Sequence, residues 1–189
     1  MTTTAPVPIG KPVGKLLVSR HDAPPTPFTR TQAVWLVIRL AYMMLGGYEL
    51  GVNDGPLVRL FHRVTGTQAG GAWCAALQMF LLFLLGDTNP LDLHAYCPDV
   101  AANAKALGIL DEKPEVGDLV LFWELVEGVW RFAHMGLVVA VNADSTIDTL
   151  EGNTNTDGSR DGWQECKKHR PVHPETRFVH WHHLIPETV

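Results

Sequence analysis

In the segment Gly70-Gly71-Ala72-Trp73-Cys74-Ala75-Ala76-Leu77, two glycines are followed by an apolar run that contains a cysteine. This pattern predicts a helix that begins at Cys74. A helix N-terminus carries partial positive charge and unpaired N–H groups, so it lowers the pKa of a thiol and can hold an anion beside it. Cys74 is therefore a candidate nucleophile. The competing interpretation is inert core, which is the more common fate of a cysteine on an apolar helix.

Composition limits the classes of protein to which the chain can belong. With 189 residues, it is long enough for one ordinary domain. A formal net charge of -5, with acidic and basic residues interspersed, argues against a nucleic-acid partner. The three cysteines show no metal-binding spacing and do not indicate a disulfide scaffold. The most apolar stretches, residues 33–45 and 79–85, are too short to cross a membrane and are expected to be buried helices.

The order of local patterns predicts an α+β fold. Residues 1–28 are rich in Pro and Thr and are expected to form an extended arm, followed by one domain over 29–189. The first residues lack the pattern of a secretory signal, so we expect synthesis in the cytoplasm. Apolar spacing predicts helices over 29–45, 57–64, 73–85 and 100–107, followed by strands over 118–123, 132–141, 145–150, 163–168 and 178–184.

A thiolate nucleophile needs a base, and His134 is the best placed of the nine histidines. It stands at the start of a strongly apolar strand, and Gly136 leaves open space beside it. If residues 142–145 form a hairpin turn, Gly136 lies opposite Glu151 and His134 lies opposite Asn153. An acid and an amide then converge on one imidazole and orient it. The alternative is a half-buried structural histidine beside a polar loop.

Four motifs follow one another along the chain: Trp73-Cys74-Ala75, Gly117-Asp118-Leu119-Val120-Leu121-Phe122, His134-Met135-Gly136 and Leu150-Glu151-Gly152-Asn153-Thr154-Asn155. Taken together and in this order, they resemble the CHAP domain, a cysteine, histidine-dependent amidohydrolase/peptidase family related to NlpC/P60 enzymes. The resemblance implies a papain-like fold in which a helix presents the cysteine to an antiparallel sheet that carries the histidine. It implies Cys74 as nucleophile, His134 as base, and Glu151 and Asn153 as the further polar residues. We expect no cofactor.

Further residues are weaker candidates. Gln68 stands six positions before the cysteine, a spacing that resembles the oxyanion glutamine of papain-like proteases. Trp73, Trp163 and Arg160 are candidate substrate-binding residues, although each also fits a core or surface role. The cluster His180-Trp181-His182-His183 suggests a metal, and a strand would place two of its imidazoles on one face. Because no third ligand is identifiable, we expect no metal. His94 and Cys97 fit a loop better than a zinc site.

The family's members mostly hydrolyse amide bonds in peptidoglycan, as amidases at the sugar–peptide junction or as endopeptidases in the stem or cross-bridge. The resemblance therefore implies a phage or prophage lysin, or an antibacterial effector, that reaches the cell wall after release or export. The expected partners are a peptidoglycan peptide and either an immunity protein or a phage-particle component. The alternatives are a non-catalytic phage-tail or structural component that docks through the Pro-rich arm, or an intracellular amidase acting on a small peptide conjugate.

Overall fold

The computed structural model describes residues 28–156 and 162–188 and has the α+β architecture that the sequence predicts. Residues 1–27, which make up nearly all of the expected arm, lie outside the described residues, and so does the candidate Arg160. The helices are α1 (Arg30–Met44), α2 (Pro56–Thr65), α3 (Cys74–Phe83) and α4 (Cys97–Ala106), with short 3₁₀ helices η1 (Gly86–Thr88) and η2 (Trp181–Leu184). The strands are β1 (Leu110–Asp111), β2 (Leu119–Val126), β3 (Val129–Val141), β4 (Thr146–Thr154), β5 (Gln164–Pro171) and β6 (Arg177–Val179).

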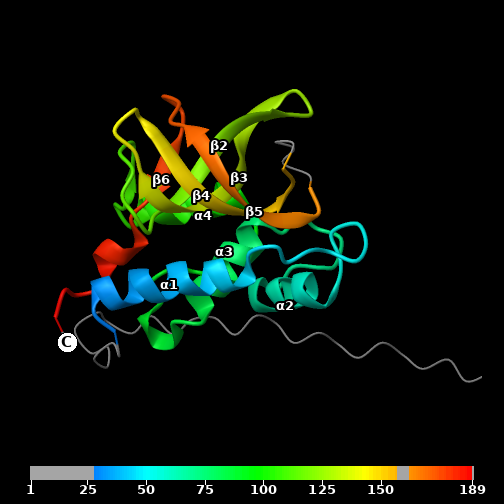
Figure 1. Cartoon of the computed structure of the whole chain (residues 1–189), viewed down its shortest axis with the longest axis horizontal. Helices are drawn as coiled ribbons and strands as arrows, with labels where there is room; N and C mark the ends of the chain where they lie inside the picture. Colours follow the sequence, from blue (N-terminus) through cyan, green and yellow to red (C-terminus); the bar gives the residue numbers. More distant parts are fainter. Residues whose placement is uncertain (1–27, 157–161, 189) are drawn as a thin grey trace, which may run out of the picture.

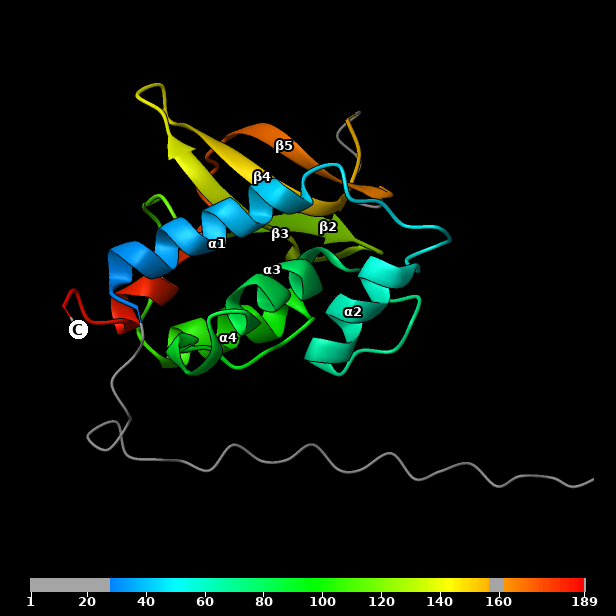
Figure 2. The same cartoon turned by 60° about the horizontal axis from the view of Figure 1, so that its bottom comes forward.

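The strands form one antiparallel sheet in the order β1-β6-β2-β3-β4-β5. The helices gather on one side of this sheet, as Figures 1 and 2 show from two directions. Helix α3 packs on β3 and β4, α4 packs on β3, and α1 and α2 lie against α3. Helix α3 is thus the layer between the sheet and the outer helices.

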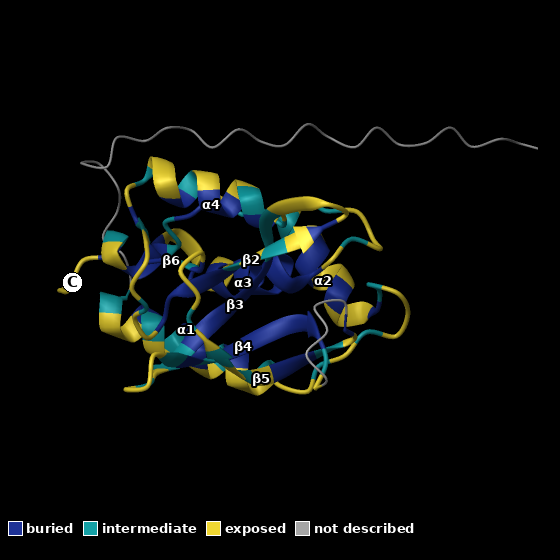
Figure 3. Ribbon diagram, turned by 90° about the horizontal axis from the view of Figure 1, so that it is seen from above, coloured by how far each residue is buried: buried dark blue, intermediate teal, exposed yellow. Residues whose placement is uncertain are grey.

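The burial of α3 follows from its composition. Every residue from Cys74 to Leu82 is buried, and a helix that is apolar on all sides is stable only inside a core. Figure 3 shows this contrast: α3 and the central strands are dark blue, while the outer helices are partly yellow. The helix begins at Cys74, which confirms the prediction. No helix of the described residues is long and apolar enough to cross a membrane.

Two predicted elements differ from the structure. Helix α4 begins at Cys97, earlier than expected, because Pro98 fits the first turn of a helix and has no N–H to leave unpaired. Cys97 therefore lies on a helix and not in a loop. The last strand ends at Val179, and residues 181–184 turn into η2. His180 and His182 consequently do not share a strand face, which corrects that expectation.

The hairpin that carries the candidate base has the expected register near the site. Leu137 pairs with Leu150, and continuing this register places Gly136 opposite Glu151. A β-bulge between Val138 and Ala140 shifts the pairing closer to the turn. Because the bulge lies on the turn side, it does not disturb the alignment of β3 and β4 next to the buried helix.

Candidate active site

Cys74 is the first residue of α3 and is only 4 % exposed. The first turn of a helix has N–H groups without intrahelical acceptors, and these surround the thiol with positive potential. One residue earlier, the Trp73 N–H donates to Asn153 Oδ1 at 3.3 Å. Asn153 has a φ of 56°, a left-handed conformation that asparagine tolerates better than most residues. Asn153 therefore ties the end of β4 to the start of the nucleophile helix.

His134 reaches the site from β3 and is held by Glu151. Its Nε2 lies 2.9 Å from Glu151 Oε2, and both side chains are buried. Phe122 stacks on the other side of the imidazole, with ring centroids 5.8 Å apart. A Cβ at Gly136 would lie 2.7 Å from Glu151 Cγ, so the glycine provides the space that the carboxylate side chain occupies. The ring is thereby fixed in orientation by one hydrogen bond and one stacking contact.

Glu151 is held in turn by two residues that sequence reasoning missed. Arg170 of β5 donates from Nε to Oε1 at 2.9 Å and from a terminal nitrogen to Oε2 at 2.6 Å. The Thr149 hydroxyl donates to Oε1 at 2.6 Å. Burial raises the pKa of Glu151, but hydrogen bonds from His134 and Arg170 outweigh it and lower the pKa to about 2. Glu151 is therefore a carboxylate at neutral pH.

The electrostatics favour a thiolate next to an imidazolium. A hydrogen bond from Cys97, whose Sγ lies 4.0 Å from Cys74 Sγ, lowers the pKa of Cys74 well below its usual range; burial opposes this shift and His134 adds to it. Burial lowers the pKa of His134, but Cys74 and Glu151 together raise it to about 10. Interaction with Cys74 and burial raise the pKa of Cys97 well above the usual value, so Cys97 keeps its proton and acts as the donor.

The resting contact between Cys74 and His134 is looser than a formed hydrogen bond. Among the described residues, none is in position to form a hydrogen bond with His134 Nδ1. Cys74 nevertheless raises the pKa of the imidazole. Catalytic hydrogen bonds are commonly long in the absence of substrate and tighten when it binds. The imidazole therefore has one nitrogen committed to Glu151 and one left for proton exchange with sulfur.

A cavity of about 140 Å³ opens over the thiol. Arg131 and Tyr96 face each other across part of its wall, with the guanidinium 6.0 Å from the ring centroid. This contact puts a cation beside the nucleophile. The residues that line the cavity are Ala72, Cys74, Ala95, Tyr96, Cys97, Arg131, Phe132, Ala133 and Asn153.

The remaining sequence candidates lie elsewhere. Gln68 is exposed in the loop between α2 and α3 and does not line this cavity. Trp73 is buried, and its Nε1 donates to Glu49 Oε2 at 3.1 Å, so it anchors the helix start from within the core. Trp163 is exposed and lies edge-on to Tyr48, again outside the cavity.

A larger hollow of about 730 Å³ includes Trp123, Trp130 and Arg170 but not Cys74 or His134. Of the hydrogen-bonded residues His134, Glu151 and Arg170, only Arg170 lines this hollow. The larger hollow is thus separate from Cys74, and the smaller cavity is the one that the thiol lines.

Comparisons with known proteins give structural likeness alone. No family model matches the sequence, and no curated protein matches it. Two crystal structures of Ly7917 are similar to this chain, at 13 % and 15 % identity and a TM-score of 0.41 each. The second of them is of Ly7917 with the hydrolyzing product of MDP. Each match covers 77 % of this chain, which spans 62 % of that protein.

Proposed function

We propose that this chain is a cysteine hydrolase that cleaves amide bonds in peptidoglycan, as an N-acetylmuramoyl-L-alanine amidase or as a stem or cross-bridge endopeptidase. The observation that carries the proposal is the buried line Cys74, His134 and Glu151, with its pKa values set for a thiolate and an imidazolium. An inert core cysteine needs none of these partners. The resemblance of the surrounding motifs to the CHAP domain supplies the substrate class.

The reaction follows from the groups in place. The Cys74 thiolate adds to the amide carbonyl carbon, and the C–O π electrons move onto oxygen. The first-turn N–H groups of α3, including that of Cys74, stabilise this oxyanion. Collapse breaks the C–N bond as the His134 imidazolium gives its proton to the departing amine. Water, deprotonated by the neutral imidazole, then attacks the thioester carbonyl, and the C–S bond breaks. The carboxylic acid leaves, and the Cys74 thiolate and the His134 imidazolium are restored.

The cavity supports an acidic peptide as substrate. Arg131 lines it close to the nucleophile, and a guanidinium binds a carboxylate through two parallel hydrogen bonds. Stem peptides carry such carboxylates. The biological settings that fit are a phage or prophage lysin and an antibacterial effector, with an immunity protein or a phage-particle component as partner and the cell wall as site of action.

The direct test is digestion of purified peptidoglycan sacculi, with soluble fragments identified by mass spectrometry. MDP, a peptidoglycan fragment, serves as a second, small substrate. We expect fragments from the wild-type protein and none from Cys74→Ala or His134→Ala, while Cys166→Ala should retain activity. Fragment masses distinguish amidase from endopeptidase cleavage. Identical fragment spectra from the wild type and Cys74→Ala would contradict the proposal.

One observation favours a second candidate, an amidase that acts on a small peptide conjugate. The cavity holds only about 140 Å³, and Cys74 is almost fully covered. A small, flexible conjugate enters such a space more easily than a cross-linked polymer. Cleavage of small γ-glutamyl or muramyl peptides without any release from sacculi would select this candidate.

A further inference from the structure

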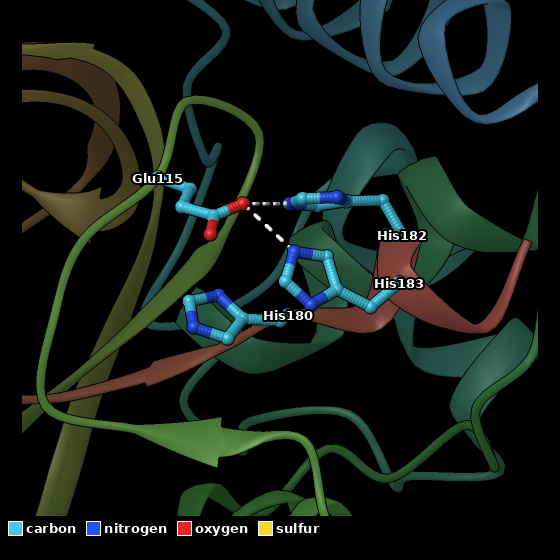
Figure 4. Close-up of side chains that lie close together, drawn as sticks. All are labelled: Glu115, His180, His182 and His183. Carbon is cyan, nitrogen blue, oxygen red and sulfur yellow. Dashed lines mark hydrogen bonds and ion pairs between the residues drawn. The ribbon is translucent and has the colours of Figure 1, made fainter. Parts of the chain in front are cut away.

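Three histidines and a glutamate converge at the C-terminal end of the chain, away from Cys74. Glu115 comes from the turn before β2, His180 follows β6, and His182 and His183 belong to η2. Figure 4 shows the four side chains directed toward a common space. Each offers one ligand atom, and these atoms all lie within 4.8 Å of one another. The 3₁₀ turn makes this possible, because a straight strand would point neighbouring imidazoles to opposite faces.

The spacing suits a tetrahedral metal. Glu115 Oε2 lies 2.8 Å from His183 Nε2 and 3.9 Å from His182 Nε2, and the His180 ring stacks on His183 with centroids 4.6 Å apart. Zinc–nitrogen bonds of about 2.0–2.1 Å place tetrahedral ligands roughly 3.3 Å from each other. Shifts of the ligand atoms by about an ångström therefore bring them to the spacing of a tetrahedral site. Glu115 and His183 have partly exposed side chains and are free to make these shifts.

Asp118 borders the cluster and is fully buried. Its Oδ1 lies 2.7 Å from His180 Nδ1, so this carboxylate orients the His180 imidazole and leaves the Nε2 of that ring for an ion. The same Oδ1 lies 3.1 Å from His182 Nε2, the nitrogen counted above as a ligand, and this contact is exchanged for the metal bond when the ion binds. Carboxylates that hold ligand histidines in place are the usual support of a zinc site. With neutral imidazoles, Glu115 and Asp118 together carry two negative charges, which a divalent cation balances.

We propose that Glu115, His180, His182 and His183 bind a divalent transition-metal ion, Zn²⁺ by ligand type and geometry. Imidazole and carboxylate donors suit zinc, and four protein ligands make a closed, structural site. The ion joins η2 to the segment before β2, and η2 already contacts the start of α1 through Arg30, which donates to the carbonyl of His183 at 3.4 Å. The site lies before the first residue of β2, whereas Phe122, which pairs with His134, lies in the middle of that strand, and the site does not depend on the proposed hydrolase activity.

The test measures zinc binding by isothermal titration calorimetry on the full chain, freed of metal with a chelator. The chain carries Cys74→Ala and Cys97→Ala so that these two thiols cannot hold the ion. We expect one equivalent of Zn²⁺ per chain. Glu115→Ala and His183→Ala should each weaken binding by about tenfold or more, since losing even a supporting group typically costs 10–100-fold. The matched control is His169→Ala, an exposed histidine on β5 that pairs with Asp148.

A thermal measurement and a spectrum complete the test. At a free zinc concentration about 100 times the dissociation constant, the unfolding midpoint should rise by roughly 5 °C or more. With the wild-type thiols present, Co²⁺ should give visible ligand-field bands without a thiolate charge-transfer band, and His183→Ala should lose them. The proposal is overturned if Glu115→Ala and His183→Ala bind zinc as the parent chain does. It is also overturned if no saturable binding is found up to about 0.1 mM zinc.

Discussion

Replacing Glu151 with Gln removes the one negative charge that faces both His134 and Arg170, at a position with no exposed surface. The pKa of Glu151 falls from 4.5 to about 2 in the folded protein, against the opposing effect of burial. A shift of about 2.5 units corresponds to roughly 3 kcal/mol of interaction that requires the charge. If His134 and Arg170 share it equally, the imidazolium loses about 1.5 kcal/mol, and the pKa of His134 should fall by about one unit from its value of about 10.

The assay follows alkylation of Cys74 by iodoacetamide as a function of pH. Only the thiolate reacts, so the midpoint on the acid side of the rate profile reports the thiol pKa. The second change in rate, on the alkaline side, occurs when the neighbouring imidazolium loses its proton and reports the pKa of His134. Mass spectrometry of the Cys74 peptide separates its signal from those of Cys97 and Cys166. The control is Glu112→Gln, which removes a surface carboxylate paired with Arg177 at 3.1 Å. An alkaline midpoint for Glu151→Gln equal to that of the wild type would refute the reasoning, because Glu151 would then not stabilise the imidazolium.

The same substitution has a consequence for stability at acidic pH. Because the folded-state pKa of Glu151 is depressed, its contribution is fully present above about pH 4.5 and is lost as the pH falls through about 2. Between pH 5 and pH 3 the loss is roughly 2 kcal/mol. Urea unfolding at these two pH values should therefore show a smaller decline for Glu151→Gln than for the wild type. An equal decline contradicts the assigned pKa.

Three further outcomes are expected. Cys97→Ala removes the largest contribution to the lowered pKa of Cys74, so the alkylation midpoint should move to higher pH. Gly152→Ala places a Cβ 2.5 Å from the Trp73 ring and should lower the unfolding free energy by about 1–3 kcal/mol, measured by urea denaturation. Arg131→Ala should raise KM for a peptide with a carboxylate near the scissile bond far more than for its amidated analogue; an equal rise for both contradicts charge recognition.

Local sequence signals predicted the parts of the site that depend on neighbouring residues. The Gly-Gly pair and the apolar run located the start of α3 at Cys74. Counting residue pairs outward from the turn of one hairpin aligned β3 with β4 and placed His134 near Glu151. Thr149 was within reach of the same reasoning, because it stands two residues before Glu151 and shares its strand face.

Contacts between elements distant in sequence were missed. Arg170 reaches Glu151 from β5, and its placement depends on a register that no tight turn fixes. Cys97 approaches Cys74 only because α4 begins earlier than predicted and packs against β3. The histidines of the C-terminus were assigned to a strand, and only the 3₁₀ turn reveals that Glu115 completes their set. These contacts depend on how elements distant in sequence pack together, and the periodicity of the sequence does not predict that packing.

The active-site charges form an alternating line from Cys74 through His134 and Glu151 to Arg170. Burying any one of them alone would cost several kcal/mol, and removing one partner leaves its neighbour uncompensated. The line sums to zero net charge, and Arg170, its outermost member, is the one with appreciable exposure. Arg170 thus acts on Glu151 and, through it, on His134, without touching Cys74. The hydrogen bond from Cys97 lowers the pKa of Cys74 most, and the imidazolium at the inner end of this line adds to it, although burial alone would raise it.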